Sequence, residues 1–461
     1  MVAAALVLAL LSFDSGLLAL AQDRQDPLPR DDGYRGIWYM NQPSKDEFKY
    51  KYSGGFATYP QQHVPIAIHS KEANKTFFVY GGRPRERNTL LHMVSYFDHA
   101  TGTVPRPAIL LDKKTDDAHD NPVLSIDDAG HLWIFSNAHG TGRPSFIHRS
   151  AKAHSIDAFE RVKETNFSYG QPWHVPGQGF FFLHTRYSPG RSLYWATSPD
   201  GRAWSEPQPL AAAEMGHYQV SLRSGTRIAT AFNVHTKPVG LNARTNLYYL
   251  ETRDFGKTWT TAGGKPVALP LSTMAHPALV RDYQSEKLLV YLKDHQVDAR
   301  GNPVILFLTS RGFAAGPSSD PRTWRTARWS GREWEVRDVL TSDHNYDYGS
   351  LHVEGTTWRL LGTTEPGPQP HSTGGEIALW ESSDEGSTWK KTRVLTKDSA
   401  RNHSYPRRPV DAHPDFYALW ADGNALAPSE SSLYFTNRSG DHVWRLPPVM
   451  KEEHQKPEVA W

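Results

Sequence analysis

The sequence predicts an all-β protein folded as a seven-bladed β-propeller, and three observations carry this prediction. Aromatic residues are abundant (15 Trp, 20 Tyr and 19 Phe), and 35 Gly and 33 Pro separate many short apolar runs. Short runs rich in aromatic and β-branched residues, bounded by turn residues, are typical of strands. No long amphipathic helix is evident, and one pattern of residues recurs seven times along the chain.

Each copy of the repeat begins with a short polar or aromatic motif, often followed by Pro, and continues into two strands joined by a turn. The copies begin at Thr58-Tyr59-Pro60-Gln61, His119-Asp120-Asn121-Pro122, Tyr169-Gly170-Gln171-Pro172, His217-Tyr218-Gln219, His276-Pro277, Asp347-Tyr348-Gly349 and Tyr405-Pro406. The predicted second strands are 77–82, 132–140, 180–187, 228–236, 288–295, 358–366 and 416–424. A ring of blades buries both faces of every sheet, so a spacing of about 50 to 70 residues favours a propeller over a solenoid.

Turn motifs of the Asp-box type, S-x-D-x-G-x-T-W, lie between the copies. The best matches are 382–389 and 252–259, a shortened one is 198–204, and 320–324 is a remnant. In such a motif Asp and Gly form a tight hairpin turn and Trp packs between strands. We therefore expect these aspartates to be structural and not catalytic.

The two ends of the chain are predicted to close the ring. The strands YRGIWYM (34–40) and SSLYFTN (431–437) are left over from the repeats and are expected to share one blade, which would remove the exposed sheet edges. No linker divides the chain. Residues 22–461 are therefore expected to form a single domain.

Residues 2–21 form an apolar run that ends in Ala19-Leu20-Ala21, directly before Gln22. This pattern predicts a signal peptide over residues 1–21 and a secreted or periplasmic protein. A misassigned start codon and a membrane anchor are the alternatives. No other segment is apolar enough to span a bilayer, so no membrane association is expected after removal of the signal.

Composition excludes several classes of partner. The formal net charge is +2, and no block of Lys or Arg marks a nucleic-acid or membrane-binding surface. Cysteine is absent, which excludes disulfides and thiolate metal sites. Attraction to an anionic substrate must therefore come from local charge in a cleft. The chain is predicted to act as a monomer.

The repeat predicts which residues meet in space. In a propeller the first strand of each blade lines the central channel, so the starts of first strands and the ends of second strands converge on one canyon. These positions hold His119, His139, Tyr169, Arg186, His217, His235, His276, Lys293, His295, His344 and Tyr405. The set is poor in carboxylates, whereas a glycoside hydrolase usually needs two of them beside the scissile bond.

Elimination at a uronate needs different groups. A cation must neutralise the sugar carboxylate so that the C5 proton becomes acidic, a base must remove that proton, and an acid must protonate O4. Arginine suits the first task because its charged fork binds a carboxylate through two N–H groups. Histidine or tyrosine suits the proton transfers.

Two segments carry a specific resemblance. HDNPVLSIDDAGHLWIFSNAHG (119–140) and YGQPWHVPGQGFFFLHTRY (169–187) resemble the BNR-repeat propeller family that includes ulvan lyases, seven-bladed enzymes acting on a sulfated rhamnose–uronate polysaccharide. The resemblance covers the chain from about Tyr34 to Asn437 as a repeat pattern and implies a lyase of an acidic, ulvan-like polysaccharide. Many family members have no lyase activity assigned.

The resemblance also implies roles for individual residues. His119 and His139, 20 residues apart, match the family's histidine pair, and Tyr169 and Arg186 occupy its Tyr and Arg positions. Arg186 would neutralise the carboxylate with help from His139, while His119 and Tyr169 would transfer protons, with base and acid left unassigned. The expected substrate contacts are His217, His235, His276, Lys293, His344 and Tyr405.

Other interpretations remain open. His119 could be a turn residue, Tyr169 a packing aromatic, and Arg186 the partner of a surface carboxylate. A sialidase also carries Asp boxes, but it has six blades and an Arg-Ile-Pro motif that is missing here, and a carbohydrate-binding propeller needs similar residues. No cofactor is predicted. A structural metal ion is not excluded, although no H-x-x-x-H spacing indicates one.

Overall fold

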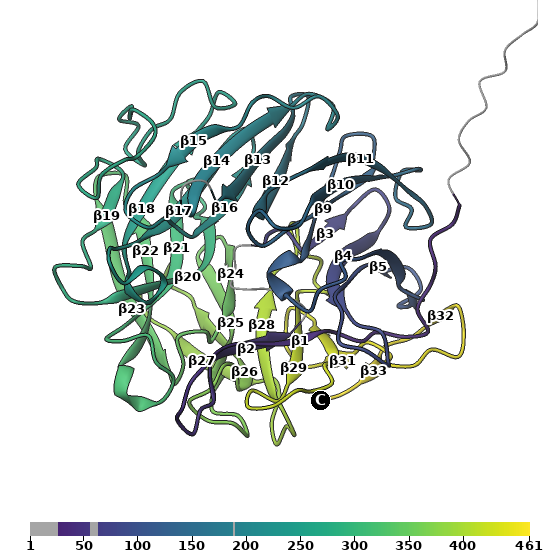
Figure 1. Cartoon of the computed structure of the whole chain (residues 1–461). Helices are drawn as coiled ribbons and strands as arrows, with labels where there is room; N and C mark the ends of the chain where they lie inside the picture. Colours follow the sequence, from purple (N-terminus) through teal and green to yellow (C-terminus); the bar gives the residue numbers. More distant parts are fainter. Residues whose placement is uncertain (1–25, 56–62, 188–189) are drawn as a thin grey trace, which may run out of the picture.

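The computed structural model describes residues 26–55, 63–187 and 190–461, and these form a ring of seven antiparallel sheets (Figure 1). The seven-bladed β-propeller predicted from the repeat is confirmed. The proposed signal peptide, residues 1–21, and the first repeat motif, 58–61, lie outside the described residues. No helix of the described ranges is long and apolar enough to cross a membrane.

Each sheet uses consecutive segments of the chain, so the blades follow one another round the ring. The first contains β3 (Ala67–Ser70), β4 (Lys75–Gly82), β5 (Leu91–Asp98) and β7 (Ala108–Asp112). The second contains β8 (Pro122–Ile126), β9 (Leu132–Ser136), β10 (Ser145–Ser150) and β11 (Phe159–Thr165). The third contains β12 (Ser168–Val175), β13 (Gly179–Arg186), β14 (Ser192–Ser198) and β15 (Gln208–Ala211). The fourth contains β16 (Gln219–Ser224), β17 (Arg227–His235), β18 (Arg244–Thr252) and β19 (Leu279–Arg281).

The remaining blades follow the same order. The fifth contains β20 (Leu289–Val297), β21 (Pro303–Ser310), β22 (Arg322–Trp329) and β23 (Trp334–Ser342). The sixth contains β24 (Gly349–Glu354), β25 (Thr357–Glu365), β26 (Glu376–Ser382) and β27 (Lys390–Val394). The seventh contains β28 (Asn402–Arg407), β29 (Ala418–Gly423), β30 (Leu433–Thr436), β31 (Val443–Arg445) and β33 (Glu458–Val459). Three short 3-10 helices, η1 (Ala118–Asp120), η2 (Gly240–Ala243) and η3 (Pro317–Ser319), occupy connections.

From the first blade to the seventh, the first strand of each blade contacts the first strand of the next, as expected of strands that line the axis. In the fifth blade the predicted second strand, 288–295, is in fact this innermost strand, β20. The predicted start at His276 is therefore wrong, because His276 precedes β19, the outermost strand of the fourth blade.

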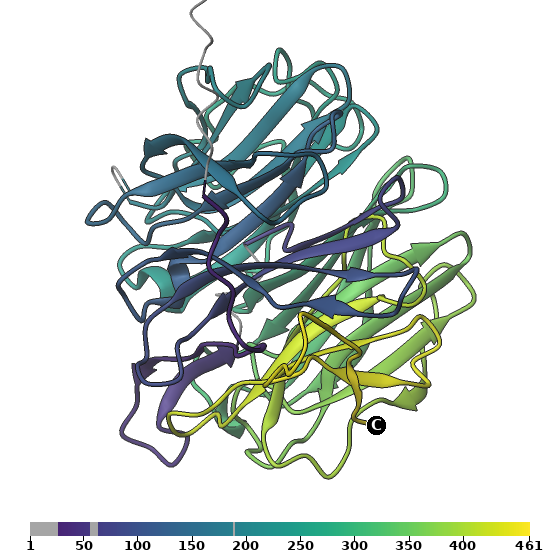
Figure 2. The ribbon, with the colours of Figure 1, turned by 90° about the vertical axis from the view of Figure 1, so that its right-hand side faces the viewer.

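The ring closes differently from the prediction that residues 34–40 and 431–437 share one blade. β30 is the third strand of the last sheet, whereas β1 (Trp38–Pro43) pairs with β2 (Tyr50–Gly55) in a separate hairpin. Gly36, just before that hairpin, forms antiparallel bridges to Gly82 in the first blade and Ser431 in the last. The C-terminal strand β32 (His454–Gln455) adds a second link by pairing with β6 (Val104–Pro105), beside the first blade. Figure 2 shows these terminal segments lying together at one side of the ring.

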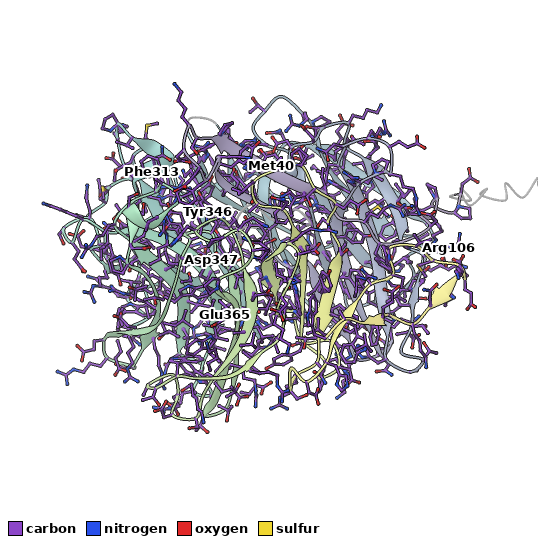
Figure 3. The ribbon with its side chains drawn as sticks, turned by 90° about the horizontal axis from the view of Figure 1, so that it is seen from below. Met40, Arg106, Phe313, Tyr346, Asp347 and Glu365 are labelled. Carbon is purple, nitrogen blue, oxygen red and sulfur yellow. The ribbon has the colours of Figure 1, made fainter. Side chains whose placement is uncertain are left out.

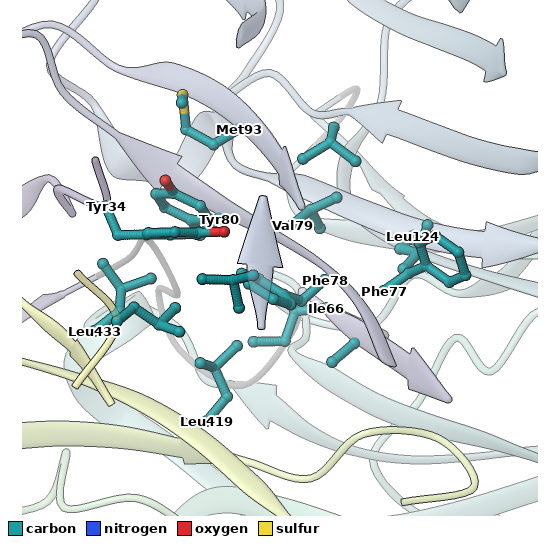
Figure 4. Packing of buried hydrophobic residues seen from close by; sticks show 14 of the residues in the cluster. Tyr34, Ile66, Phe77, Phe78, Val79, Tyr80, Met93, Leu124, Leu419 and Leu433 are labelled. Atoms are coloured by element: carbon teal, nitrogen blue, oxygen red, sulfur yellow. The ribbon is translucent and has the colours of Figure 1, made fainter. Parts of the chain in front are cut away.

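A continuous hydrophobic cluster fills this junction. Tyr34, Phe78 and Tyr80 from the N-terminal side pack with Leu419 and Leu433 of the last blade (Figure 4). All five side chains are buried, and Tyr34 also donates a 2.7 Å hydrogen bond to the carbonyl of Pro105. Burial of aromatic and aliphatic surface, and not a shared sheet, therefore joins the first blade to the last.

Neighbouring blades are joined by Trp rings that pack on turn glycines. Gly201 follows Asp200, whose carboxylate accepts hydrogen bonds from the next turn amides, and it has a φ of +74°. A Cβ atom at Gly201 would lie 2.3 Å from the ring of Trp133 in the second blade. The turn thus needs Gly both for its backbone conformation and for the close approach of the Trp ring.

Replacing Gly201 with Ala is expected to lower the free energy of unfolding by about 3 kcal/mol, since left-handed strain and overpacking add. The matched control is Gly177→Ala, because Gly177 has a similar φ of +70° but no heavy atom within 4 Å of its Cβ position. The control is expected to lose only about 1 kcal/mol. Urea midpoints measure both values. Equal losses would show that the Trp133 contact contributes nothing.

Candidate active site

A single carboxylate positions two stacked histidines at the start of the second blade. Asp117 is the N-cap of η1, and its Oδ1 accepts hydrogen bonds from the backbone N–H of His119 at 3.1 Å and from the ring Nδ1 of His119. Its Oδ2 accepts from Nδ1 of His139 at 2.8 Å. The two imidazole rings lie 4.1 Å apart between centroids and 21° from parallel. Both rings therefore direct Nε2 away from Asp117.

The local sequence explains this arrangement. The backbone N–H of His139, just beyond β9, donates to Oδ1 of buried Asp120 at 2.7 Å. Arg143 donates from Nε to Oδ2 of Asp120 at 2.7 Å and from Nη2 to Asp117 at 3.0 Å. Asp120 thereby ties the turn that carries His119 to the strand end that carries His139. The sequence analysis missed Asp117, although it lies only two residues before His119.

Burial keeps His119 neutral, against the effect of Asp117. Its side chain is only 3% exposed, and burial lowers its pKa more than the hydrogen bond and charge of Asp117 raise it. Burial also opposes ionisation of Asp117, but the hydrogen bonds from His119 and His139 outweigh it and hold the pKa of Asp117 well below the usual range. His139 is more accessible, with 29% of its side chain exposed. Of the two imidazoles, His139 is the one that a substrate can reach.

Two tyrosines lie beside the histidine pair. The hydroxyl groups of Tyr169 and Tyr187 are 3.1 Å apart, and the ring of Tyr187 meets that of His139 edge-on, with centroids 5.7 Å apart. Tyr169 is 1% exposed and has a φ of +50°, at an irregularity in the pairing of β12 with β13. Tyr187, directly after β13, is only half-buried. Tyr187 is therefore the more accessible of the two phenols, and the buried hydroxyl of Tyr169 contacts it.

A second buried contact fixes the inner histidine. The hydroxyl of Tyr52, in β2, lies 3.2 Å from Nε2 of His119. The ring of Tyr39, in β1, packs edge-on against His119 at 5.4 Å. Both ring nitrogens of His119 are therefore engaged by protein groups, which makes His119 a residue that positions its neighbours.

Arg191 supplies a cation to this cluster. Its Nε donates to the hydroxyl of Tyr187 at 3.3 Å, and its guanidinium lies 5.1 Å from the centroid of the Tyr187 ring. Burial lowers its pKa, but the phenols of Tyr218, Tyr187 and Tyr169 more than compensate, so its pKa is raised. Its backbone is held by the fourth blade, through a parallel bridge to Gly216.

Arg186 does not lie in this cluster, so its predicted position was wrong. Successive side chains of a strand point to opposite faces, and Tyr187 points to the histidines. Arg186 points to the other side, where its guanidinium lies 5.6 Å from the ring of Tyr194. It is exposed and lines a separate pocket between the second and third blades with Lys163 and Trp204. The equivalent cation comes from Arg191, directly before β14.

The other predicted contacts divide into two groups. Five are buried within the ring: His217, His235, Lys293, His344 and Tyr405. Two of them form hydrogen bonds with backbone groups of the propeller. The ring of His217 bonds the backbone N–H of Ala213 and the carbonyl of Asn233, and Lys293 donates to the carbonyl of Asn345 at 2.7 Å. His276 lies outside this group, beside β19, and binds the backbone of Ala278. Its predicted place in the canyon was wrong because the start of the fifth blade was misplaced.

Sequence reasoning also missed a tyrosine cage around Arg244. This guanidinium lies 5.0, 4.7 and 5.6 Å from the rings of Tyr218, Tyr291 and Tyr346. Burial and the charges of Arg244 and Arg191 lower the pKa of nearby Lys51 to about 6. Figure 3 shows Tyr346 below Phe313, a residue whose ring lies 5.4 Å from the ammonium of Lys51. Arg244 therefore adds positive charge among these tyrosines, whereas the lowered pKa of Lys51 leaves its amine mostly neutral at pH 7.

Asp117, His119 and His139 also have the chemistry of metal ligands, since one ligand atom of each lies within 4.8 Å of the others. In the described residues, however, both Nδ1 atoms already donate to Asp117. The trio is therefore arranged as a carboxylate that orients two imidazoles, and its accessible chemistry is proton transfer at His139 and Tyr187 beside the Arg191 cation.

The fold and this site define a seven-bladed propeller with a cationic His–Tyr–Arg centre at its axis. The chain belongs to the BNR repeat-containing family, whose model matches residues 94–342. The resemblance noted in the sequence is thereby confirmed.

Comparisons with individual proteins agree with this family membership. An ulvan lyase of Nonlabens ulvanivorans is 24% identical over 346 residues, covering 67% of this chain and 72% of that protein. An ulvan lyase of Alteromonas sp. (strain LOR) is 20% identical over 344 residues, covering 66% and 69%. Among solved structures, a PL25 ulvan lyase has a TM-score of 0.69 at 18% identity, covering 89% of this chain and 96% of that one. A second structure of such an enzyme, bound to -[GlcA(1-4)Rha3S]-, has a TM-score of 0.68 at 18% identity, covering 90% and 96%.

Proposed function

We propose that this protein is a polysaccharide lyase that cleaves a uronate-containing, ulvan-like polysaccharide by β-elimination. The observation that carries the proposal is the meeting of Arg191, Tyr187 and His139 at the axis. The similarity to ulvan lyases supports the choice of substrate. Export of the protein is part of the proposal, because the substrate is an extracellular polymer, and it rests on the apolar run of residues 2–21.

The reaction assigns one task to each accessible group. The guanidinium of Arg191 pairs with the uronate carboxylate and stabilises the negative charge that develops when the C5–H bond breaks. The C5 proton passes to a base, the C4–O4 bond breaks, the C4–C5 double bond forms, and O4 receives a proton. Tyr187 and His139 are the two accessible groups that can carry these protons.

The buried residues hold these groups in place. Asp117 accepts the Nδ1 hydrogen of His139 and so leaves its Nε2 available as a proton acceptor. The hydroxyl of Tyr169 and the Nε of Arg191 both contact the hydroxyl of Tyr187. The Nε of Arg191, 3.3 Å from the hydroxyl of Tyr187, stabilises the negative charge that develops on that oxygen as it gives up its proton. We therefore propose that Nε2 of His139 is the base that takes the C5 proton and that the Tyr187 hydroxyl is the acid that protonates O4. This pair takes the place of His119 and Tyr169, for which base and acid were left unassigned.

The test is an assay for the new double bond. Purified protein is incubated with ulvan, other uronate polysaccharides and sialosides, and ultraviolet absorbance of the C4–C5 double bond is followed. Absorbance that grows with ulvan is the expected result. Free sialic acid without absorbance would indicate a hydrolase, and binding without any product would indicate a carbohydrate-binding propeller.

Tyr187→Phe is expected to lower kcat on ulvan by about 10²-fold, because it removes a proton-carrying hydroxyl without changing the ring. The matched variant is Tyr169→Phe, which removes the hydroxyl 3.1 Å away and should cost less than about tenfold. Initial rates of absorbance change measure both. A larger loss in Tyr169→Phe than in Tyr187→Phe would reverse the assignment.

A further inference from the structure

Three histidines meet at the junction between the first and last blades, away from the candidate active site. His69 lies in β3, His99 follows β5, and His413 lies between β28 and β29. The ring centroids of His99 and His413 are 3.8 Å apart, and that of His69 lies 5.2 and 5.0 Å from them. The cluster therefore joins two blades that are at opposite ends of the chain.

Two of these imidazoles have a buried nitrogen that is not used by the fold. Nε2 of His69 and Nδ1 of His99 are buried and have no hydrogen-bond partner among the described residues. The opposite nitrogen of His99, Nε2, lies 2.8 Å from the hydroxyl of Thr76, and His69 bonds the backbone of Asp411. Histidines that bind metals are commonly held in this way, with one ring nitrogen fixed by the protein and the other directed at the ion.

Asp415 adds a carboxylate to the cluster. Its Oδ2 lies 3.7 Å from Nδ1 of His413, and one ligand atom each of His99, His413 and Asp415 lies within 4.8 Å of the other two. Ligand atoms around tetrahedral zinc are about 3.4 Å apart, since zinc–nitrogen and zinc–oxygen distances are about 2.1 Å. Closing the set by about 1 Å requires only side-chain rotation, because the Asp415 side chain is 66% exposed. The backbone N–H of Asp415, 3.2 Å from Nδ1 of His413, is the group that an ion would displace.

We propose that His99, His413 and Asp415, with His69 beside them, bind one divalent transition-metal ion. Zinc is the ion that a set of imidazole nitrogens and a carboxylate oxygen favours among those that proteins commonly hold. Because His99 belongs to the first blade and His413 to the last, the ion clamps the junction where the ring closes. In a chain without cysteine, it provides the cross-link that a disulfide would otherwise give.

The experiment measures zinc binding by the full chain after treatment with a chelator. Titration calorimetry should give one ion per chain, and free zinc at about one hundred times Kd should raise Tm by roughly 3 °C. His99→Phe and His413→Phe keep an aromatic ring but remove the ligand, so both should lose binding. Asp415→Asn, at an exposed position that folding does not need, should weaken binding by about tenfold.

Two further variants identify where zinc binds. His442→Phe, at an exposed position stacked on Trp444, should bind zinc as the original chain does. His139→Asn should also retain binding, because it alters only the candidate active site. Loss of the bound ion in His139→Asn, with retention in Asp415→Asn and His413→Phe, would overturn the proposal, and so would the absence of any bound zinc.

Discussion

Replacing Arg191 with Ala is expected to lower kcat/KM on ulvan by about 10³-fold. The guanidinium is the cation nearest the Tyr187 hydroxyl, at 3.3 Å, and elimination depends on neutralising a carboxylate whose negative charge grows as the C5 proton leaves. Removing one preorganised group that stabilises such charge typically costs 10²- to 10³-fold in rate, and the carboxylate here would also lose a binding partner. Initial rates of absorbance change over a range of ulvan concentrations measure the loss.

Arg186→Ala is the matched control. This residue lies five positions away in the sequence, carries the same charge and is exposed, but its guanidinium contacts Tyr194 on the other side of the strand. We expect its kcat/KM to stay within about threefold of the original value. Arg191→Lys should recover part of the activity, since it restores charge without the two-pronged hydrogen bonding. A severe loss in Arg186→Ala, with little change in Arg191→Ala, would refute the corrected site.

Acid is expected to unfold this protein at a pH near 5.5. Ten histidines are fully buried, and burial lowers the pKa of each: His63, His92, His119, His184, His217, His235, His295, His344, His352 and His403. In the unfolded chain the same groups bind protons below pH of about 6.5. The folded state therefore has its full stability above this pH and loses it as the pH falls.

The size of the effect follows from proton linkage. Each neutral buried histidine costs about 1.4 kcal/mol of stability per pH unit below about 6.5, so ten cost on the order of 10 kcal/mol by pH 5.5. That equals the whole stability of a typical domain, about 5 to 15 kcal/mol. Urea midpoints at pH 8, 7 and 6 measure the fall.

A single variant tests whether the buried histidines cause the loss of stability in acid. His184 packs between Phe182 and Tyr194, so His184→Phe should keep the packing and remove one proton from the linkage. Its stability should fall less steeply by about 1.4 kcal/mol per pH unit. Exposed His442→Phe should leave the slope unchanged. A protein equally stable at pH 8 and 5.5 would show that these histidines become protonated without unfolding.

The fold could be predicted from the sequence because the repeat carries it. Second strands such as 132–140 and 180–187 recur, each preceded by a first strand and a turn. Closing the ring is how sheets built from such repeats remove their exposed edges. The exception was the fifth blade. A long connection in the fourth blade precedes its outermost strand, β19, so His276 was taken for the start of the fifth blade. The spacing of apolar segments along the sequence cannot show whether a segment is the outermost strand of one blade or the innermost strand of the next.

The histidine pair could be predicted, but its partners could not. His119 opens the first strand of one copy and His139 ends the second strand of the same copy, and the repeat brings these two places together. The choice between Arg186 and Arg191, in contrast, depends on the face to which one strand end turns. Alternation shows that Arg186 and Tyr187 point apart, but not which of them faces the axis. The contacts in three dimensions answer that question, because the guanidinium of Arg186 lies against Tyr194 and that of Arg191 lies against Tyr187.

The shared carboxylate has a consequence for how this centre can change during evolution. Because both imidazoles rely on Asp117, a substitution there misaligns the inner and outer rings together, and no single repair at either histidine restores the other. Effects of substitutions at the three positions should therefore be strongly non-additive. We therefore expect proteins that evolve from this one either to keep Asp117, His119 and His139 together or to lose all three.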